Sequence, residues 1–343
     1  MLALRKSSAD ATSLTLVEVE VAEPQPGQVR IAVTGAGICG TDLHILDGDY
    51  PSRAPVTLGH EIAGIVDAVG PGVAPEWLGA LVAPETAFST CGICRWCRNG
   101  RPMLCAERLS VGSGLDGGFA SSVIVPARNL HRLPVWLDDR AAALMEPLAC
   151  VCNALCDPGR IEVGDRVIVS GAGPVGILAA QVARSAGATV TLVGTRIDTV
   201  RLALASAIGL DTRSVDDQRD LDALAAEGAQ RRIDVVVECA GAAPAVRSAL
   251  TWLRPQGRLI QVGLLSGEIA VPFGEIVTRE LTVTSGFGSS PASWERAVSL
   301  VGERRVDLAP LISEAMPLRA HVAAFQRLSR RDGLKIVFDP RLD

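Results

Sequence analysis

The sequence predicts an α/β protein with two domains, and three observations support this prediction. Its 343 residues are too many for one ordinary hydrophobic core and suit two. Residues 1 to about 135 contain short β-branched runs separated by glycine and proline, which is typical of a β-rich domain. From Asp165 onward, strand-like and helix-like patterns alternate, which is typical of a doubly wound parallel sheet.

The elements of the first part are predicted from these β-branched runs. An apolar, alanine-rich stretch at residues 139–156 follows the runs and is typical of a helix. The strands are predicted at residues 14–21, 28–35, 63–69 and 121–125.

The second part opens with residues 166–170, a continuous apolar run as expected for a strand buried on both faces. After about residue 288 the pattern changes to a helix-like stretch at 294–301 and a late strand at 334–338. This change suggests a C-terminal segment that returns to the first domain. Between these points, helices are predicted at 175–185 and 199–207, and strands at 189–193, 234–238, 258–262 and 281–285.

Composition and charge argue against several classes of protein. Hydrophobic residues make up 48% and charged residues 21%, as in a globular chain rather than a disordered one. A net charge of −5 without a lysine or arginine cluster argues against a nucleic-acid partner. The N-terminus lacks an apolar h-region, and the longest uncharged window, residues 167–183, is shorter than the ~20 residues that span a bilayer. We therefore expect a cytoplasmic protein without a membrane partner.

The most specific local motif is a run of four closely spaced cysteines. Glycine and proline surround the run, so it is predicted to form a loop-like lobe. Such spacings suit tetrahedral zinc, and gaps of two residues suit a metal better than disulfides, which are the alternative. Four protein thiolates leave no open coordination position, so this zinc would be structural. The cysteines are Cys91, Cys94, Cys97 and Cys105.

The remaining cysteines divide into two kinds. Three lie in one apolar run and a fourth ends another, so we interpret these four as small core residues. Only Cys39 is then left for another role. The four core candidates are Cys150, Cys152, Cys156 and Cys239.

A glycine-rich turn lies between the predicted strand at 166–170 and the predicted helix at 175–185. In its G-x-G-x-x-G pattern, the first glycine makes the tight turn, the second lets the backbone approach a pyrophosphate, and the third lets helix and strand pack closely. The alternative is an ordinary strand–helix turn, but this position favours a dinucleotide whose pyrophosphate lies at the helix N-terminus. The predicted cofactor contacts are Gly171, Gly173, Pro174, Val175 and Gly176.

The end of the second predicted strand bears on the choice between NAD and NADP. NAD sites usually place an acid there for the ribose hydroxyls, whereas an arginine accommodates a 2′-phosphate. Here the residues are Gly194, Thr195 and Arg196, and no acid comes before Asp198. We expect Arg196 to pair with the phosphate of NADP, aided by hydrogen bonds from Thr195 and the Gly194 backbone. Alternatively, Arg196 is a solvated loop residue, Asp198 caps the next helix and the cofactor is NAD.

These motifs occur in the order found in a known family, and together they cover essentially the whole chain. The chain resembles the zinc-dependent medium-chain dehydrogenase/reductase family, in particular its polyol (sorbitol) and threonine dehydrogenase branch. The resemblance rests on residues 37–44, residues 59–61, the four-cysteine lobe, residues 145–147 and the turn at 171–176.

The resemblance implies how the domains and metals are arranged. It implies a GroES-like catalytic domain at residues 1–150 and 289–343, and a Rossmann domain at residues 151–288. It places the active site in the cleft between them and implies two zinc ions per chain, one structural and one catalytic.

By position, the resemblance implies that Cys39, His60 and Glu61 hold the catalytic zinc. Glu146 would bind this zinc directly or through water. A thiolate, an imidazole and a carboxylate with an exchangeable position suit a catalytic zinc chemically. His60 and Glu61 are adjacent, so both can face one metal only where the backbone turns. The glycines expected to permit this turn are Gly59 and Gly64.

The resemblance also implies a route for the proton of the alcohol. In the family, a hydroxyl two residues after the zinc-binding cysteine takes this proton, and a histidine five residues after the cysteine passes it to solvent through the cofactor ribose. Thr41 and His44 occupy those positions. Alternatively, Thr41 is a local backbone cap and His44 a surface histidine. We expect Asp42 to fix local geometry rather than to take part in chemistry.

One departure from the family bears on the substrate. Polyol dehydrogenases carry an Arg-Tyr pair that grips sugar hydroxyls, and by spacing to Trp294 this chain has Ser289 and Ser290 instead. This argues against a sorbitol-like open-chain polyol and leaves a cyclic sugar, a cyclitol or a smaller secondary alcohol open. Tyr50, Phe119 and Trp294 either line the substrate pocket or belong to the core.

The favoured function is a zinc- and NADP-dependent dehydrogenase that transfers hydride between the cofactor and a secondary alcohol or ketone of a polyol, sugar or cyclitol. The alternative enzyme is an NAD-dependent amino-alcohol dehydrogenase of the threonine type. A non-catalytic relative is disfavoured because the catalytic zinc ligands are present. The family implies a homodimer or homotetramer, often paired through sheet edges, and residues 281–285 are a candidate edge.

Overall fold

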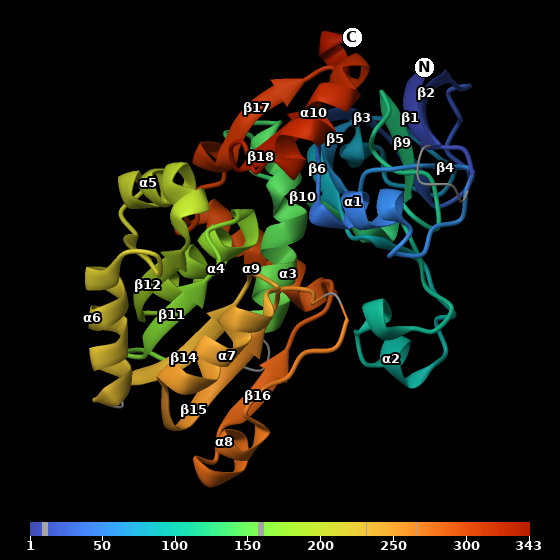
Figure 1. The fold of residues 1–343 in the computed structure, drawn as a ribbon. Coiled ribbons are helices and arrows are strands. Elements are labelled where there is room, and N and C mark those ends of the chain that lie inside the picture. Colours follow the sequence, from blue (N-terminus) through green and yellow to red (C-terminus); the bar gives the residue numbers. More distant parts are fainter. Residues whose placement is uncertain (9–12, 157–160, 231, 266) are drawn as a thin grey trace. The chain divides into compact units, whose positions relative to one another are not determined.

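The computed structural model describes residues 1–8, 13–156, 161–230, 232–265 and 267–343. These residues form two compact units (Figure 1). Unit 1 comprises Met1–Pro147, Ser289–Gly302 and Leu311–Asp343, and unit 2 comprises Leu148–Gly288 and Glu303–Pro310.

Unit 1 is built around a seven-stranded sheet in the order β10-β6-β5-β3-β18-β17, with β9 also paired to β3. The late strand β18 pairs antiparallel with β3, so the C-terminal segment returns to the first domain, as the sequence suggested. A smaller sheet has the order β2-β1-β4, and β7 pairs with β8. The strands are β1 (Leu2–Lys6), β2 (Leu14–Glu18), β3 (Gln28–Gly37), β4 (Val56–Thr57), β5 (Glu61–Val69), β6 (Leu81–Pro84), β7 (Ala87–Ser89), β8 (Leu109–Ser110), β9 (Ser122–Pro126), β10 (Leu130–Arg132), β17 (Ile312–Met316) and β18 (Lys335–Phe338). The helices are α1 (Gly40–Asp47), α2 (Arg95–Arg98), α9 (Pro291–Gly302) and α10 (His321–Ser329), and α3 (Met145–Leu155) begins in unit 1.

The core of unit 1 joins residues that are far apart in the sequence. Phe119 is fully buried and packs edge-on against Phe338, with 5.0 Å between the ring centroids. Phe325 from α10 lies against both rings. Such edge-to-face pairs add about 0.5–1.5 kcal/mol to the burial of the rings. The C-terminal helix and strand therefore complete the core that the N-terminal strands begin.

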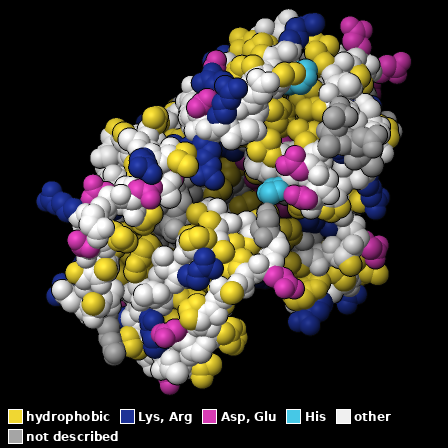
Figure 2. All heavy atoms as spheres, in the orientation of Figure 1, with side chains coloured by type: hydrophobic (Ala, Val, Ile, Leu, Met, Phe, Trp, Pro, Cys, Tyr) yellow, Lys and Arg dark blue, Asp and Glu magenta, His cyan; other side chains and the backbone are white. Residues whose placement is uncertain are grey.

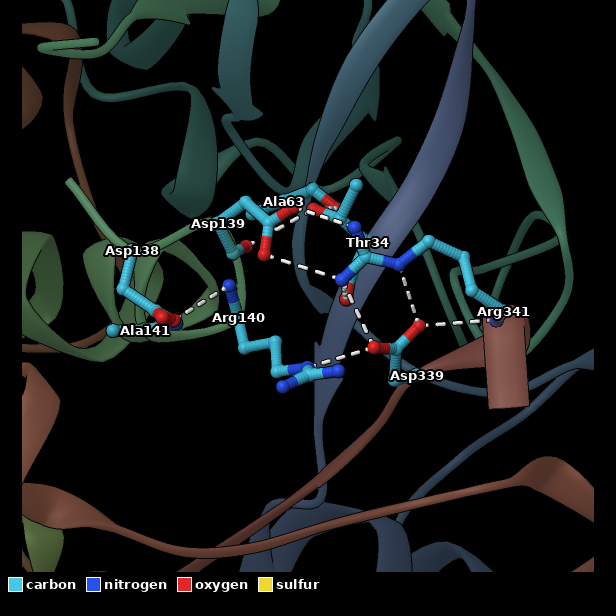
Figure 3. Close-up of polar contacts among 8 residues, drawn as sticks. All are labelled: Thr34, Ala63, Asp138, Asp139, Arg140, Ala141, Asp339 and Arg341. Atoms are coloured by element: carbon cyan, nitrogen blue, oxygen red, sulfur yellow. Dashed lines mark hydrogen bonds and ion pairs between the residues drawn. The ribbon is translucent and has the colours of Figure 1, made fainter. Parts of the chain in front are cut away.

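A buried carboxylate near the C-terminus forms hydrogen bonds that link this end of the chain to the rest of unit 1 (Figure 3). Asp339 is 0% exposed and accepts hydrogen bonds from the Nε atoms of Arg140, at 2.7 Å, and Arg341, at 2.8 Å. Arg341 also pairs with Asp139 and donates to the carbonyl of Thr34 on β3. Burial alone would raise the pKa of Asp339, but the hydrogen bonds from the two arginines outweigh burial and lower it.

We expect Asp339→Asn to lower the free energy of unfolding by about 2 kcal/mol at pH 7. This loss of stability is smaller than the loss expected on breaking a fully buried ion pair, because both arginines are partly exposed. A carboxyl with a lowered folded pKa stabilises the fold above its unfolded pKa, about 3.9, and this contribution disappears as the pH falls through the folded pKa. Urea unfolding should therefore show a large difference at pH 7 and a smaller one near pH 3. The exposed pair of Arg30 and Asp67 supplies the control, Asp67→Asn, which should change stability by at most about 1 kcal/mol.

Unit 2 contains the predicted doubly wound sheet, with six parallel strands in the order β13-β12-β11-β14-β15-β16. Helix α4 packs on β11 and β12, and α7 packs on β14 and β15. The strands are β11 (Arg166–Ser170), β12 (Thr189–Gly194), β13 (Asp211–Ser214), β14 (Ile233–Glu238), β15 (Leu253–Gln261) and β16 (Thr282–Ser285). The helices are α4 (Pro174–Ser185), α5 (Thr199–Ala207), α6 (Gln218–Ala229), α7 (Ala243–Trp252) and α8 (Phe273–Thr278).

The register of the parallel strands aligns their carboxyl ends. Ser170 of β11 lies beside Glu238 of β14, which lies beside Gln261 of β15. Ligands of open α/β sheets bind outside the carboxyl ends of the strands. This row of polar residues therefore marks the edge of unit 2 at which a cofactor is expected.

The surface carries both signs of charge. On the face drawn in Figure 2, basic and acidic side chains are intermixed rather than sorted into separate regions. Within the described part of the chain, no helix combines the length and apolar character that crossing a membrane requires.

Candidate active site

The four cysteines of the lobe converge in the structure. All four sulfur atoms lie within 4.8 Å of one another, and short helix α2 lies between the second and fourth cysteine. The Sγ atoms of Cys94 and Cys97 are 3.6 Å apart, as are those of Cys91 and Cys105. A disulfide would require about 2.0 Å, whereas sulfurs at the corners of a zinc tetrahedron are separated by about 3.8 Å. The spacing therefore fits four thiolates around one zinc ion.

A second group of possible metal ligands is formed by Cys39, His60 and Glu61, whose ligand atoms also lie within 4.8 Å of one another. Cys39 is the N-cap residue of α1, and Glu61 is the first residue of β5. The chain turns at Gly59, just before His60 and Glu61, where φ is +92°. Two elements of the N-terminal part thus bring three residues together that the resemblance assigned to one metal.

The glycines around this group have different roles. At Gly59 the positive φ favours glycine, and a Cβ would lie 2.4 Å from the Phe119 ring. Gly64 has no positive φ, so the expectation that it permits a turn is wrong. A Cβ at Gly64 would lie 2.1 Å from the carbonyl oxygen of Ala32, so this glycine lets β5 approach β3. Gly37 leaves room for the Glu61 carboxylate, whose Oε2 would lie 2.1 Å from a Cβ there.

Asp42 orients two members of the metal group. It is 0% exposed, and its Oδ2 accepts a hydrogen bond of 2.9 Å from the backbone N–H of Cys39. Its Oδ1 lies 3.7 Å from Nδ1 of His60, beyond hydrogen-bond range, so this contact is electrostatic and leaves the other ring nitrogen available to a metal. Burial lowers the pKa of His60, but the charges of Asp42 and Cys39 outweigh this and raise it. This placement agrees with the expectation that Asp42 fixes local geometry.

Lys335 is a member of the site that the sequence analysis missed. It lies on β18, is 4% exposed, and donates from Nζ to Glu61 Oε1 at 2.7 Å and to the Ile38 carbonyl at 2.9 Å. Burial lowers the pKa of Lys335, but the negative charge of Glu61 outweighs this effect and raises it. The other oxygen, Glu61 Oε2, has no hydrogen-bond partner among the described residues. One oxygen of Glu61 is therefore held by the ammonium group, and the buried second oxygen fits a metal ligand.

The remaining residues assigned to catalysis lie beside the metal group or outside it. Thr41 Oγ1 is 3.6 Å from Cys39 Sγ. His44 lies one turn along the same helix, and its Nδ1 is 3.9 Å from Asp49 Oδ2. Glu146 is buried at the start of α3 and does not belong to the three-residue metal group. Its contact with zinc, and the proton relay, stay predictions.

The glycine-rich turn has the geometry that a dinucleotide loop requires. Gly171 has a φ of +108°, and a Cβ at Gly176 would lie 1.8 Å from the Gly171 carbonyl oxygen. Gly173 is the N-cap of α4, and no atom lies within 4 Å of a Cβ placed there. Pro174 and Val175 form the first turn of α4. The loop is therefore closely packed on its inner side and open at Gly173, where a pyrophosphate would approach.

At the end of β12, most hydrogen-bond donors already have partners. The backbone N–H and Oγ1 of Thr195 both donate to Asp198 Oδ2, at 3.1 Å and 2.8 Å. The backbone N–H of Arg196 donates to Asp216 Oδ2 at 2.6 Å. For the Arg196 guanidinium, by contrast, no hydrogen bond or ion pair with another described residue is found, and Arg196 is exposed. Asp198 therefore caps the following turn, and the arginine side chain points to no internal acceptor.

Comparison with known proteins shows the family to which this chain belongs. Two family models match the chain, "Alcohol dehydrogenase GroES-like domain" over residues 25–135 and "Zinc-binding dehydrogenase" over residues 174–303. A sorbitol dehydrogenase from Halalkalibacterium halodurans is 40% identical over 329 residues, which are 94% of this chain and 94% of that protein. The chain belongs to the zinc-dependent medium-chain dehydrogenase/reductase family.

Two further relatives support the assignment of this chain to the medium-chain dehydrogenase family. An L-threonine 3-dehydrogenase from Streptomyces avermitilis is 37% identical over 99% of both chains. The solved structure of a zinc-binding dehydrogenase from Sinorhizobium meliloti, bound to NADP, has a TM-score of 0.90 and 32% identity, and the match covers 99% of both chains. The chain is thus an NAD(P)-dependent alcohol dehydrogenase with a GroES-like and a Rossmann domain.

The structure also places the residues considered for the substrate pocket of this dehydrogenase. Trp294 is fully buried, stacks on His131 at 4.9 Å, and donates from Nε1 to Ser289 Oγ at 3.0 Å. Ser290 caps α9 and is 2% exposed. Trp294 and the two serines therefore anchor α9. Phe119 is a core residue, whereas Tyr50 is partly buried at the edge of the unit 1 core.

Proposed function

We propose that this dehydrogenase transfers hydride between NADP and a secondary alcohol or ketone of a sugar, polyol or cyclitol. The observation that supports the reaction most strongly is the convergence of Cys39, His60 and Glu61, whose ligand atoms lie within 4.8 Å of one another. A mixed thiolate, imidazole and carboxylate set leaves an exchangeable position, unlike the four-thiolate lobe. Similarity to a sorbitol dehydrogenase supports a hydroxylated substrate.

The residues around the metal group suit proton removal from an alcohol. Zinc, when bound, would act as a Lewis acid on the alcohol oxygen, and the nicotinamide would accept the hydride. In this proposal Thr41 accepts the hydroxyl proton of the alcohol as it releases its own, and the 3.6 Å between its Oγ1 and Cys39 Sγ supports that role. His44 is partly exposed on the same helix and can pass this proton to solvent.

A screen of alcohols with both cofactors tests the substrate class. We expect oxidation of cyclic sugars, cyclitols or small secondary alcohols with NADP, because Ser289 and Ser290 replace the Arg-Tyr pair and are buried. The similarity to an L-threonine 3-dehydrogenase favours one second candidate, an amino-alcohol substrate with NAD. Turnover of threonine-like amino alcohols alone, with NAD, would contradict the proposal and support that candidate.

The preference for NADP rests on Arg196. Its exposed guanidinium has no partner among the described residues, whereas the Thr195 hydroxyl and N–H are already bonded to Asp198. The 2′-phosphate would therefore pair with the Arg196 side chain rather than with Thr195. The NADP bound to the Sinorhizobium meliloti relative supports this choice.

We expect Arg196→Asp to weaken NADP binding about ten- to a hundredfold, since a charge-assisted hydrogen bond contributes roughly 1.5–3 kcal/mol. The new carboxylate would repel the 2′-phosphate and could accept from the ribose hydroxyls of NAD. The measurement is kcat/KM with each cofactor for both proteins. Arg247→Asp makes the same charge change at an exposed position of helix α7 and should leave the preference unchanged. A wild type that prefers NAD about tenfold would refute the assignment of Arg196.

We propose a homodimer or homotetramer assembled through the free edge of β16. This strand ends the six-stranded sheet of unit 2. Val283 on β16, Phe273 and Val277 on α8, and nearby Phe287 are all substantially exposed apolar residues. Such an edge pairs readily with a second chain. Val283→Lys should increase the monomer fraction in light scattering, and a purely monomeric wild type would contradict the proposal.

A further inference from the structure

We propose that Glu238 is a positioning residue that holds the two turns supporting the dinucleotide loop. These turns follow β14, at Ala240 and Gly241, and β15, at Gly263. Glu238 is 0% exposed, so it acts through these turns rather than by touching the cofactor. The inference rests on the proposed binding of a nicotinamide cofactor and adds a residue that no sequence motif indicates.

The Glu238 side chain accepts hydrogen bonds from the turn after β14 and from Gln261, the last residue of β15. Oε1 accepts from the backbone N–H groups of Ala240, at 2.8 Å, and Gly241, at 3.0 Å. Oε2 accepts from Nε2 of Gln261, which also donates to the Gly263 carbonyl at 2.8 Å. In addition, the backbone carbonyl of Glu238 accepts from the N–H of Gly263 at 2.8 Å. One residue thus fixes the backbone after two neighbouring strands.

The two turns interlock without space for side chains. A Cβ at Gly263 would lie 2.4 Å from the Gly241 nitrogen and 2.9 Å from Glu238 Oε2. Gly241 has a φ of +63°, and a Cβ there would lie 2.3 Å from the Leu264 carbonyl oxygen. A shift of either turn is therefore transmitted to the other.

The turn after β14 also borders the glycine-rich loop. A Cβ at Gly171, the first glycine of the loop, would lie 2.7 Å from the Ala240 nitrogen. The N–H of Cys239 donates to the Ser170 carbonyl at 2.7 Å, immediately before that glycine. The glycine-rich loop therefore rests on the backbone segment that Glu238 holds.

The energetic cost of this arrangement suggests a function beyond stability. Burial raises the pKa of Glu238, although its hydrogen bonds oppose that shift. A buried carboxylate is costly unless it is fully hydrogen-bonded, and apolar packing could join two parallel strands without it. Hydrogen bonds fix the orientation of the backbone N–H groups in the two turns, whereas apolar packing does not. This orientation matters because the turns lie at the edge of the sheet where the cofactor is expected to bind.

The test compares Glu238 with a carboxylate at the opposite end of the same strand. Asp234 accepts from the Arg166 backbone N–H at 2.8 Å and from Arg254 Nε at 2.6 Å. Glu238→Ala removes both ties. Glu238→Gln keeps an acceptor for Ala240 but places one amide NH₂ against another at Gln261. Asp234→Asn is the matched control, because it disturbs a carboxylate of β14 away from the cofactor edge.

Three quantities are measured for each protein: Kd for NADPH and NADH by fluorescence titration, kcat at saturating cofactor, and melting temperature without cofactor. We expect Glu238→Ala to raise the cofactor Kd at least about tenfold, and Glu238→Gln about three- to tenfold. In both, kcat at saturating cofactor should stay within about threefold, because no group at the reacting atoms changes. Asp234→Asn should lower the melting temperature and leave Kd within about twofold.

A Kd for Glu238→Gln within about twofold of wild type would overturn the inference, and this holds even if Glu238→Ala does not fold. Equal increases of Kd in Glu238→Gln and Asp234→Asn would also overturn it, because they would indicate a general loss of stability. A wild-type protein that binds neither cofactor would instead refute the proposed function. The two failures are therefore distinguishable.

Discussion

We expect Cys39→Ser to abolish alcohol oxidation while leaving the fold largely intact. Serine is a poor zinc ligand because its hydroxyl stays protonated, so the group formed with His60 and Glu61 would lose its one thiolate. Loss of Lewis-acid catalysis should lower kcat by a factor of about a thousand or more, at least about 4 kcal/mol in the barrier. Asp42 would still cap α1, so the melting temperature should change little. Steady-state kinetics, zinc analysis and thermal unfolding of the purified variant check these expectations.

Cys150→Ser is the matched control for this substitution. Cys150 is partly buried on α3 and belongs to neither group of possible metal ligands. The control should retain the zinc content and turnover of the wild type. Full activity in Cys39→Ser, or equal loss of activity in both variants, would show that Cys39 has no role at a catalytic metal.

We expect Cys94→Ser, unlike Cys39→Ser, to lower the thermal stability of the protein while leaving its turnover nearly unchanged. Apart from the buried Met103, the lobe packs few apolar side chains, since Ile93 is 71% exposed and Leu104 39%. Its order would therefore depend on zinc, and structural zinc contributes directly to the free energy of folding. We expect the melting temperature to fall by at least about 5 °C. Below the new melting temperature, kcat should remain within about threefold of the wild type.

Thermal unfolding of the wild type with and without a strong chelator provides the comparison for Cys94→Ser. Chelation should lower the melting temperature of the wild type more than that of the variant. An unchanged melting temperature in Cys94→Ser, with zinc content equal to the wild type, would contradict a structural zinc in the lobe.

The sequence predicted those features that depend on neighbouring residues. Four of the five apolar runs predicted as strands in the second domain became parallel strands within one residue of their expected bounds, whereas β15 begins five residues earlier than expected, at Leu253. The central strands β11 and β14 have continuous apolar runs because both of their faces are buried. The four cysteines and the glycine-rich turn were also recognisable, because their spacing along the chain determines their geometry. Cys39, His60 and Glu61 required the family resemblance, since single cysteines, histidines and carboxylates are not distinctive.

Contacts between distant parts of the chain could not be predicted in this way. Lys335 donates a hydrogen bond to Glu61, which lies 274 positions earlier in the sequence. The only sign of this in the sequence is that a charged lysine stands in an otherwise apolar strand. Glu238 ends an apolar strand in the same manner, and its partner Gln261 belongs to the next strand. Gly64 was expected to permit a turn, whereas its role is to let β5 approach β3 at Ala32. The missed contacts of Lys335 and Glu238 and the wrong role for Gly64 have one cause. The sequence does not show which distant part of the chain lies next to a residue.

Zinc stoichiometry tests the central claim of two metal sites with separate roles most directly. The measurement is the zinc content per chain, by mass spectrometry of metals, for the wild type, Cys39→Ser and Cys94→Ser in parallel with activity. We expect two zinc ions in the wild type and one in each variant, with turnover lost only in Cys39→Ser. A fully active wild type with one zinc per chain, or a Cys39→Ser variant that keeps both zinc ions and full turnover, would contradict it.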